Sequence, residues 1–167
     1  AVDVAQILYN VPGRTACDMS DETSLRLAEI PNIIGLKDAT GNLDRAAWLV
    51  QHRPEGFALY SGDDATAMEF VLAGGDGVIS VTANVVPAAM HEMVMAARSG
   101  DRQQADTINQ TLTALHRDLF VEANPIPVKW AVQQMGLMGP GIRLPLTGLA
   151  SEHQQVVRDA MVKAGVL

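Results

Sequence analysis

Four short apolar runs, each ending in small or polar residues, constrain the fold of this chain most strongly. Patterns typical of amphipathic helices separate the runs, and Ser, Asp or Asn residues stand where each helix would be capped. Strands and helices that alternate at this spacing are typical of βα units with a parallel sheet. The runs are apolar throughout, which predicts strands covered on both faces. They are "AQILYN" at residues 5–10, "IIGLK" at 33–37, "FALYS" at 57–61 and "GVIS" at 77–80.

After the fourth run the sequence shows only helical patterns, starting near residues 87, 101, 127 and 152. The chain is therefore expected to divide into a βα region, residues 1–99, and a helical region, residues 100–167. Four βα units do not close an eight-stranded barrel. A small open doubly wound sheet is the alternative, but such sheets bind ligands at a Gly-rich first turn, and no G-x-G-x-x-G motif follows a strand here.

Composition excludes several classes of function. A formal net charge of −7 argues against binding to nucleic acid or to anionic membrane surfaces. No apolar stretch reaches the roughly 18 residues of a transmembrane helix. The single cysteine, Cys17, cannot form an intramolecular disulfide and suits a cytoplasmic setting. The four histidines are scattered without the spacing of metal ligands, so no metal site is expected.

Lys37 is the residue that points most directly to chemistry. It is one of only three lysines, and it ends an apolar strand at the edge where parallel α/β folds place their sites. A lysine amine attacks a carbonyl only when it is neutral, and burial in apolar surroundings favours the neutral form. A lysine that reaches solvent from a strand end and pairs with Asp38 is an equally simple interpretation of these residues.

Two further residues would complete such a site. Tyr9 ends the first strand, and a phenol there can move protons for an imine formed on Lys37. Arg14 follows in "NVPGRT", where a guanidinium can bind a carboxylate with two hydrogen bonds or can simply be a solvated loop residue. Asp63 and the adjacent Asp64 are first of all candidates for a helix cap.

Six blocks of sequence together resemble one enzyme family. In chain order these blocks are "YNVPGRT", "NIIGLKDATGN", "YSGDDATA", "GGDGVISVTANV", "LFVEANPIPVKWA" and "GIRLPL". The sequence resembles the 4-hydroxy-tetrahydrodipicolinate synthase (dihydrodipicolinate synthase) family, from residue 8 to about 146 and on to the C-terminus. The resemblance implies an α/β fold, the second half (strands five to eight) of a (β/α)8 TIM barrel, followed by a C-terminal helical region.

The resemblance also implies an activity. Family members are class I aldolase-type lyases that condense pyruvate with aspartate 4-semialdehyde in the diaminopimelate route to lysine. They use no cofactor beyond a covalent imine with pyruvate, and they are usually homotetramers in the cytoplasm. Lys37 resembles the lysine that forms this Schiff base, Tyr9 the tyrosine that relays protons, and Arg14 the arginine that receives the carboxylate of the semialdehyde.

Three other positions match the family at its substrate site. Ile79 resembles the residue whose backbone contacts pyruvate, and Gly62 and Asp63 resemble the loop on the side of the second substrate. Asp38 stands where many members carry glutamate, a mild departure that is not expected to change the chemistry.

The main departure from the family is length. The match covers only the second half of the family's chain, so the threonine pair and the second tyrosine of the proton relay have no counterpart here. Two alternatives to this enzyme therefore remain. One is N-acetylneuraminate lyase or a keto-deoxy-sugar-acid aldolase of the same superfamily, against which Arg14 and "NPIPVKWA" argue. The other is an inactive half-barrel with only a role in assembly.

Overall fold

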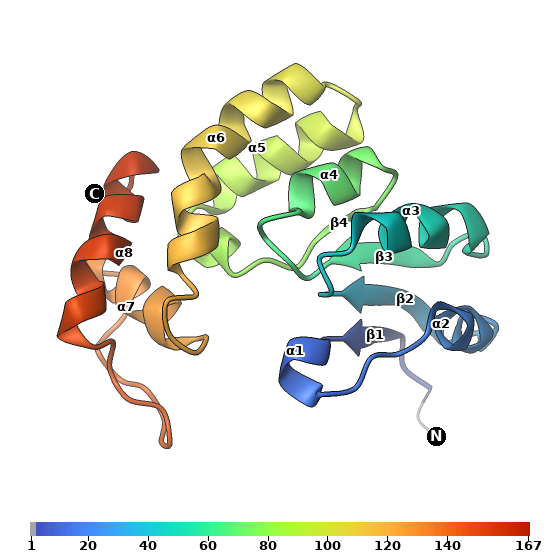
Figure 1. The fold of residues 1–167 in the computed structure, drawn as a ribbon, viewed down its shortest axis with the longest axis horizontal. Helices are drawn as coiled ribbons and strands as arrows, with labels where there is room; N and C mark the ends of the chain where they lie inside the picture. Colours follow the sequence, from blue (N-terminus) through green and yellow to red (C-terminus); the bar gives the residue numbers. More distant parts are fainter. Residues whose placement is uncertain (1–2) are drawn as a thin grey trace. The chain divides into compact units, whose positions relative to one another are not determined.

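Strands and helices alternate in the first half of the chain, and helices alone follow (Figure 1). The computed structural model describes residues 3–167. In chain order its elements are β1 (Gln6–Asn10), α1 (Pro12–Thr15), α2 (Asp21–Ala28), β2 (Ile33–Asp38), α3 (Leu43–His52), β3 (Ala58–Ser61), α4 (Ala67–Leu72), β4 (Gly77–Val78), the 3-10 helix η1 (Thr82–Asn84), α5 (Pro87–Arg98), α6 (Arg102–Asp118), α7 (Ile126–Gln134) and α8 (Ser151–Lys163).

Two units can be distinguished by their internal packing. The first comprises Ala1–Ser80 and Val94–Arg102, and the second comprises Val81–Met93 and Gln103–Leu167. The helix α5 contributes residues to both units. The expected division between residues 99 and 100 remains a prediction.

The four expected strands form one parallel sheet in the order β1-β2-β3-β4 (Figure 1). Each strand lies within one or two residues of its predicted bounds, with β4 reduced to Gly77–Val78. A doubly wound sheet reverses its strand order at the point where the ligand binds. This sheet runs consecutively from one edge to the other, which is the order found in a (β/α)8 barrel.

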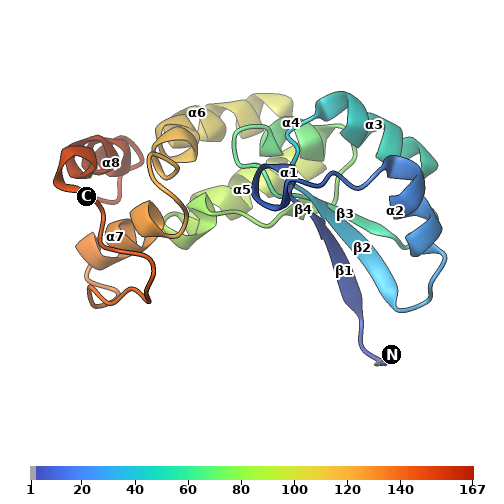
Figure 2. The same ribbon diagram turned by 60° about the horizontal axis from the view of Figure 1, so that its bottom comes forward.

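The core of the first unit lies on one face of this sheet. Leu36 of β2 and Leu59 of β3 are completely buried there. Figure 2 shows α2 and α3 on one side of the strands. The helices therefore cover the face to which these leucines point. The buried cluster consists of Leu36, Ala46, Leu49, Phe57, Leu59 and Phe70.

The opposite face of β1 is open to solvent. Ile7 and Tyr9 alternate with Leu8, so they point away from the helices, and they are 43% and 48% exposed. The expectation that the strands are covered on both faces is therefore wrong for β1. The reason is that α2 and α3 lie on the other side of the strands (Figure 2).

Side-chain caps fix the starts of two helices as expected. Ser20 Oγ accepts a hydrogen bond from the Thr23 amide at 3.2 Å, and Asn42 Oδ1 accepts one from the Arg45 amide at 3.0 Å. The helix expected after residue 64 begins later, at Ala67.

The second unit is helical, with α7 and α8 packed against each other (Figure 1). Arg158 of α8 lies 5.5 Å from the centre of the Trp130 ring of α7, a cation–π contact. Ala150 donates a backbone hydrogen bond to Glu122 Oε1 at 2.9 Å, which fixes the start of α8. The largest fully buried apolar side chains of this unit are Val85, Met90, Met93, Leu112, Leu115, Leu119, Val157 and Met161.

Candidate active site

The strand register brings Tyr9, Lys37 and Tyr60 side by side. Tyr9 of β1 pairs with Lys37 of β2, and Lys37 pairs with Tyr60 of β3. Paired residues of neighbouring strands point to the same face of a sheet. The three side chains therefore share the face opposite the helices. Lys37 Nζ lies over the Tyr9 ring, 4.2 Å from its centre, in the geometry of a cation–π contact.

Asp38 is not the partner of Lys37. Its carboxylate points to the helix-covered face, where it accepts hydrogen bonds from Asn10 Nδ2 at 3.0 Å and from the Thr40 hydroxyl at 2.5 Å. Arg45 Nε lies 3.6 Å from the same carboxylate. The interpretation of Lys37 as a strand-end lysine held by Asp38 is therefore wrong.

Gly62 lies against the Lys37 side chain. A Cβ atom at this position would be 2.8 Å from Lys37 Cε and 2.8 Å from the Cβ atom of Ala39. The Gly62 amide donates a hydrogen bond to the Asp38 carbonyl at 2.7 Å, so the backbone here is held close to β2. Only a glycine at residue 62 leaves room for the Lys37 side chain in this conformation.

Ile79 and Asp63 lie at the same end of the sheet. The Ile79 amide donates to the Ser61 carbonyl at 2.9 Å, which holds it beside the end of β3, and its side chain is 44% exposed. Asp63 Oδ2 accepts hydrogen bonds from the Thr66 amide at 3.0 Å and from the Thr66 hydroxyl at 2.7 Å. This carboxylate therefore orders the turn before α4, and a contact with substrate stays a prediction.

Arg14 lies in α1, the single helical turn that follows β1. Pro12 begins this turn, and Ala16 ends it in the left-handed conformation with a φ of 53°. The Arg14 side chain is exposed. A guanidinium on so short a connection from Tyr9 is available to a ligand carboxylate, and this role stays a prediction.

Three features of this site were missed from the sequence. Tyr60 was not singled out because its run, "FALYS", gives no sign of which side chains face which way. The hydrogen bond between Asn10 and Asp38 joins residues 28 positions apart. The close contact of Gly62 with Lys37 could not be read from spacing either, because it depends on how β2 and β3 end.

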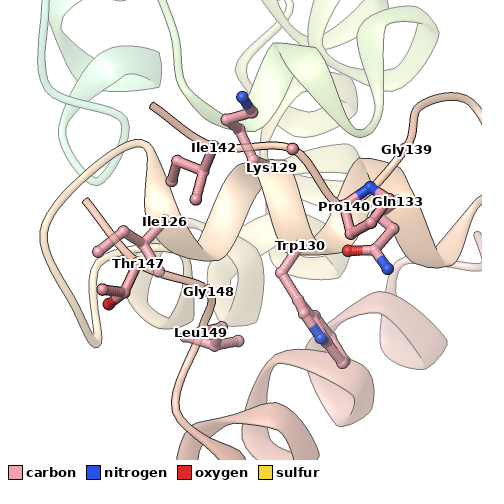
Figure 3. A pocket seen from close by; sticks show the side chains of 11 residues that line it. Ile126, Lys129, Trp130, Gln133, Gly139, Pro140, Ile142, Thr147, Gly148 and Leu149 are labelled. Atoms are coloured by element: carbon pink, nitrogen blue, oxygen red, sulfur yellow. The ribbon is translucent and has the colours of Figure 1, made fainter. Parts of the chain in front are cut away.

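Three cavities lie away from the group formed by Tyr9, Lys37 and Tyr60, and none is a better candidate for a substrate site. A cavity of about 20 Å³ in the second unit lies between α7 and the loops around Gly139 and Gly148 (Figure 3). That volume holds about one water molecule. Two larger hollows, of about 340 and 240 Å³, lie around Pro54–Phe57 in the first unit. They adjoin the N-terminal ends of the strands, the end opposite Lys37, and parallel α/β folds place their sites at the C-terminal ends.

Within residues 3–167, no three His, Cys, Asp or Glu side chains gather in a group that could hold a metal ion. Across the same residues, none of the helices combines the length and the apolar character needed to span a membrane.

Known proteins match this chain closely. A family model described as the dihydrodipicolinate synthetase family matches residues 1–164. A 4-hydroxy-tetrahydrodipicolinate synthase of Methylococcus capsulatus is 64% identical over 167 residues, which are 100% of this chain and 57% of that protein. The enzyme of the same name from Nitrosomonas eutropha is 63% identical over 99% of this chain and 57% of its own length.

A solved structure gives the same result for the fold. The chloride-inhibited dihydrodipicolinate synthase of Acinetobacter baumannii, complexed with pyruvate, superposes with a TM-score of 0.97 at 53% identity. The match covers 100% of this chain and 57% of that one. The chain thus spans little more than half the length of the relatives it matches, as the second half of a (β/α)8 barrel with its C-terminal helical region. By sequence and by fold, this chain belongs to the dihydrodipicolinate synthetase family.

Proposed function

We propose that this chain carries the imine-forming site of a lyase that condenses pyruvate with aspartate 4-semialdehyde, in the route to diaminopimelate and lysine. The observation that carries the proposal is the Lys37 amine, held 4.2 Å from the Tyr9 ring centre at the C-terminal ends of two parallel strands. The names of the relatives support the reaction, and the pyruvate complex of the Acinetobacter baumannii relative supports the first substrate.

Lys37 acts as the nucleophile in this proposal. Its neutral amine adds to the ketone carbon of pyruvate, and uptake of a proton with loss of water gives an iminium ion. The positive nitrogen then withdraws electrons from the neighbouring methyl carbon. This carbon loses a proton, and the imine becomes an enamine. That carbon attacks the aldehyde of the second substrate and forms the new C–C bond. Tyr9 has the phenol that moves protons in these steps.

The remaining residues bind the substrates. Arg14 has the fork of N–H donors that matches the carboxylate of aspartate 4-semialdehyde. The Ile79 backbone contacts pyruvate, and Gly62 and Asp63 line the side where the second substrate enters. The catalyst needs no cofactor beyond the imine itself.

The activity of a complete enzyme belongs to a (β/α)8 barrel, and this chain spans 57% of such relatives. We infer that a complete barrel assembles as a homo-oligomer, a tetramer in the intact enzyme. The chain by itself has the lysine and the tyrosine of the imine step.

The test supplies pyruvate with either of two acceptors, aspartate 4-semialdehyde or N-acetylmannosamine, and measures pyruvate consumption. We expect consumption with the semialdehyde only, and none with the Lys37→Arg variant. Preference for N-acetylmannosamine would indicate an N-acetylneuraminate lyase instead. Folded protein that consumes pyruvate with neither acceptor would contradict the condensation and favour an inactive half-barrel with a role in assembly.

A further inference from the structure

A layer of buried polar side chains lies directly behind Tyr9 and Lys37. The next residues along their strands, Asn10 and Asp38, are also paired with each other. Successive side chains of a strand point to opposite faces, so these two point away from the open face and into the unit. They are only 3% and 4% exposed. Burying a polar group destabilises the fold unless the group is hydrogen-bonded, so the hydrogen-bond partners of Asn10 and Asp38 show which parts of the chain they hold together.

Asn10 uses its whole side-chain amide. Its Nδ2 donates to Asp38 Oδ1 at 3.0 Å and to Asp18 Oδ1 at 2.7 Å. Its Oδ1 accepts from the Met19 amide at 3.1 Å. The residue therefore ties β1 both to β2 and to the loop that follows α1.

Asp38 extends the layer toward β3. Its second oxygen accepts from the Thr40 hydroxyl at 2.5 Å, and its backbone carbonyl accepts from the Gly62 amide at 2.7 Å. The Ala39 amide in turn donates to the Asn10 carbonyl at 2.9 Å. The ends of β1, β2 and β3 are thus joined at the level of the Tyr9 and Lys37 side chains.

Arg45 supplies the positive charge of this layer. Its guanidinium lies 3.0 Å from Asp18, 2.8 Å from Asp21 and 3.6 Å from Asp38, and it also donates to the Met19 carbonyl. The hydrogen bond from Asn10, with help from Arg45, lowers the pKa of Asp18. Burial raises the pKa of Asp21 even though Arg45 is adjacent.

We propose that Asn10 and Asp38 are positioning residues for the imine reaction, because their hydrogen bond across β1 and β2 fixes the Tyr9 ring relative to the Lys37 amine. The inference rests on the proposed function of Lys37. A lysine side chain is long and flexible, so the position of its strand decides which part of the site its amine reaches. A misplacement of about 1 Å in a reacting group can cost on the order of 100-fold in rate.

Asp38→Asn tests this role with a change of almost no volume. An amide at residue 38 has one acceptor oxygen where the carboxylate has two, so its NH₂ group must face either Asn10 Nδ2 or the Thr40 amide, and both of these are donors. The matched control is Asp44→Asn, the same chemical change at an exposed residue of α3. Asp38→Glu keeps a carboxylate and serves as the conservative rescue.

Each protein is incubated with pyruvate and borohydride, and the modified fraction of Lys37 is followed over time. The rate constant and the final modified fraction are determined separately at several pyruvate concentrations. For Asp38→Asn we expect the rate constant to fall on the order of 10-fold or more, with half-saturating pyruvate unchanged. Asp44→Asn should behave as the parent chain, and Asp38→Glu should recover most of the rate.

A purely structural role gives a different result. Asp38→Asn would then lower the melting temperature and the final modified fraction, while the rate constant of the folded fraction stayed at the parent value. That outcome would overturn the inference. If Asp38→Asn does not fold, Thr40→Val removes one donor to Asp38, and an unchanged rate constant there overturns it equally. A parent chain in which pyruvate never modifies Lys37 contradicts the proposed function itself.

Discussion

At the scale of single residues, the missing side chain of Gly62 decides where the Lys37 amine can lie. We predict that Gly62→Ala displaces the lysine, because the new methyl group would come within 2.8 Å of Lys37 Cε and of the Ala39 side chain. The rate of imine trapping should fall on the order of 10-fold. The measurement is borohydride trapping with pyruvate, compared with the parent chain at equal amounts of folded protein.

Gly139→Ala is the matched control for this change. A Cβ atom at Gly139 meets nothing within 4 Å, and its backbone does not adopt a positive φ. The control should trap pyruvate at the parent rate. Equal rates for Gly62→Ala and the parent chain would contradict the close contact between Gly62 and Lys37.

The sequence predicts individual reactive residues better than it predicts their surroundings. Lys37 and Tyr9 could be named because each ends an apolar run, and the register brings them together. The polar layer around Asn10 could not be predicted from the sequence, because Arg45 and Asp18 are 27 residues apart in sequence and come together only in the folded chain. Tyr60 was missed for a related reason: in a run that is apolar on both faces, nothing marks which residues share a face.

At the scale of secondary-structure elements, β2 and β3 lie too close together at Gly35 to leave room for a side chain. A Cβ atom there would lie 2.7 Å from the Ala58 carbonyl oxygen, a backbone atom that cannot move aside without shifting β3. We predict that Gly35→Ala lowers the free energy of unfolding by about 1–3 kcal/mol, the usual cost of overpacking. Urea denaturation measures this loss, and an unchanged midpoint would contradict the register of these strands.

An ion pair links α4 to the start of α6 within the first unit. Arg102 donates to Glu69 through two nitrogens, at 2.5 and 3.0 Å, and these hydrogen bonds lower the pKa of Glu69. Both side chains are well exposed, so above about pH 5 the pair contributes only about 0.5 kcal/mol to the free energy of unfolding.

The pH dependence of this pair follows from the direction of the pKa shift. A carboxyl group whose pKa is lower in the folded chain than in the unfolded chain stabilises the fold at pH values above its pKa in the unfolded chain. This stabilisation is lost as the pH falls through its pKa in the folded chain. Glu69→Gln should therefore destabilise the chain by about 0.5 kcal/mol at pH 7 and by less at pH 3, which lies below the ordinary carboxyl pKa. Urea unfolding at both pH values is the measurement, with the exposed Glu92→Gln of α5 as control. An equal loss at both pH values would contradict the pair.

Elements with a strong periodic signal were predicted well, and short ones were not. The strands and the long helices appear within a few residues of expectation because their apolar patterns extend over several residues. The single turn α1 and the 3-10 helix η1 have no such pattern. The start of α4 was misplaced because Asp63 caps the turn before the helix instead of the helix itself.

At the scale of the whole molecule, the chain exposes an edge strand with an apolar face. Exposed apolar surface beside an unpaired strand edge promotes association between chains. We predict that the chain associates as its concentration rises and that Ile7→Lys, at a side chain 43% exposed on β1, weakens this association. Sedimentation velocity over a range of concentrations is the measurement.

Leu137→Lys provides the control for this prediction. Leu137 is 69% exposed but lies outside the sheet, after α7, so the same substitution should leave association unchanged. If Leu137→Lys weakened association as much as Ile7→Lys, the sheet edge would not be the interface.

We predict that pyruvate forms its imine on Lys37, and the chain has only two other lysines, Lys129 and Lys163. Borohydride reduces such an imine to a carboxyethyl amine, which trypsin does not cleave. Because cleavage after Lys37 is lost while cleavage after Arg26 and Arg45 continues, the peptides of residues 27–37 and 38–45 should be replaced by one peptide of residues 27–45 that bears the added group. We predict this peptide in the presence of pyruvate, and neither Lys129 nor Lys163 modified. Folded protein that yields only the unmodified peptide of residues 27–37, or that is modified equally at all three lysines, would contradict the account.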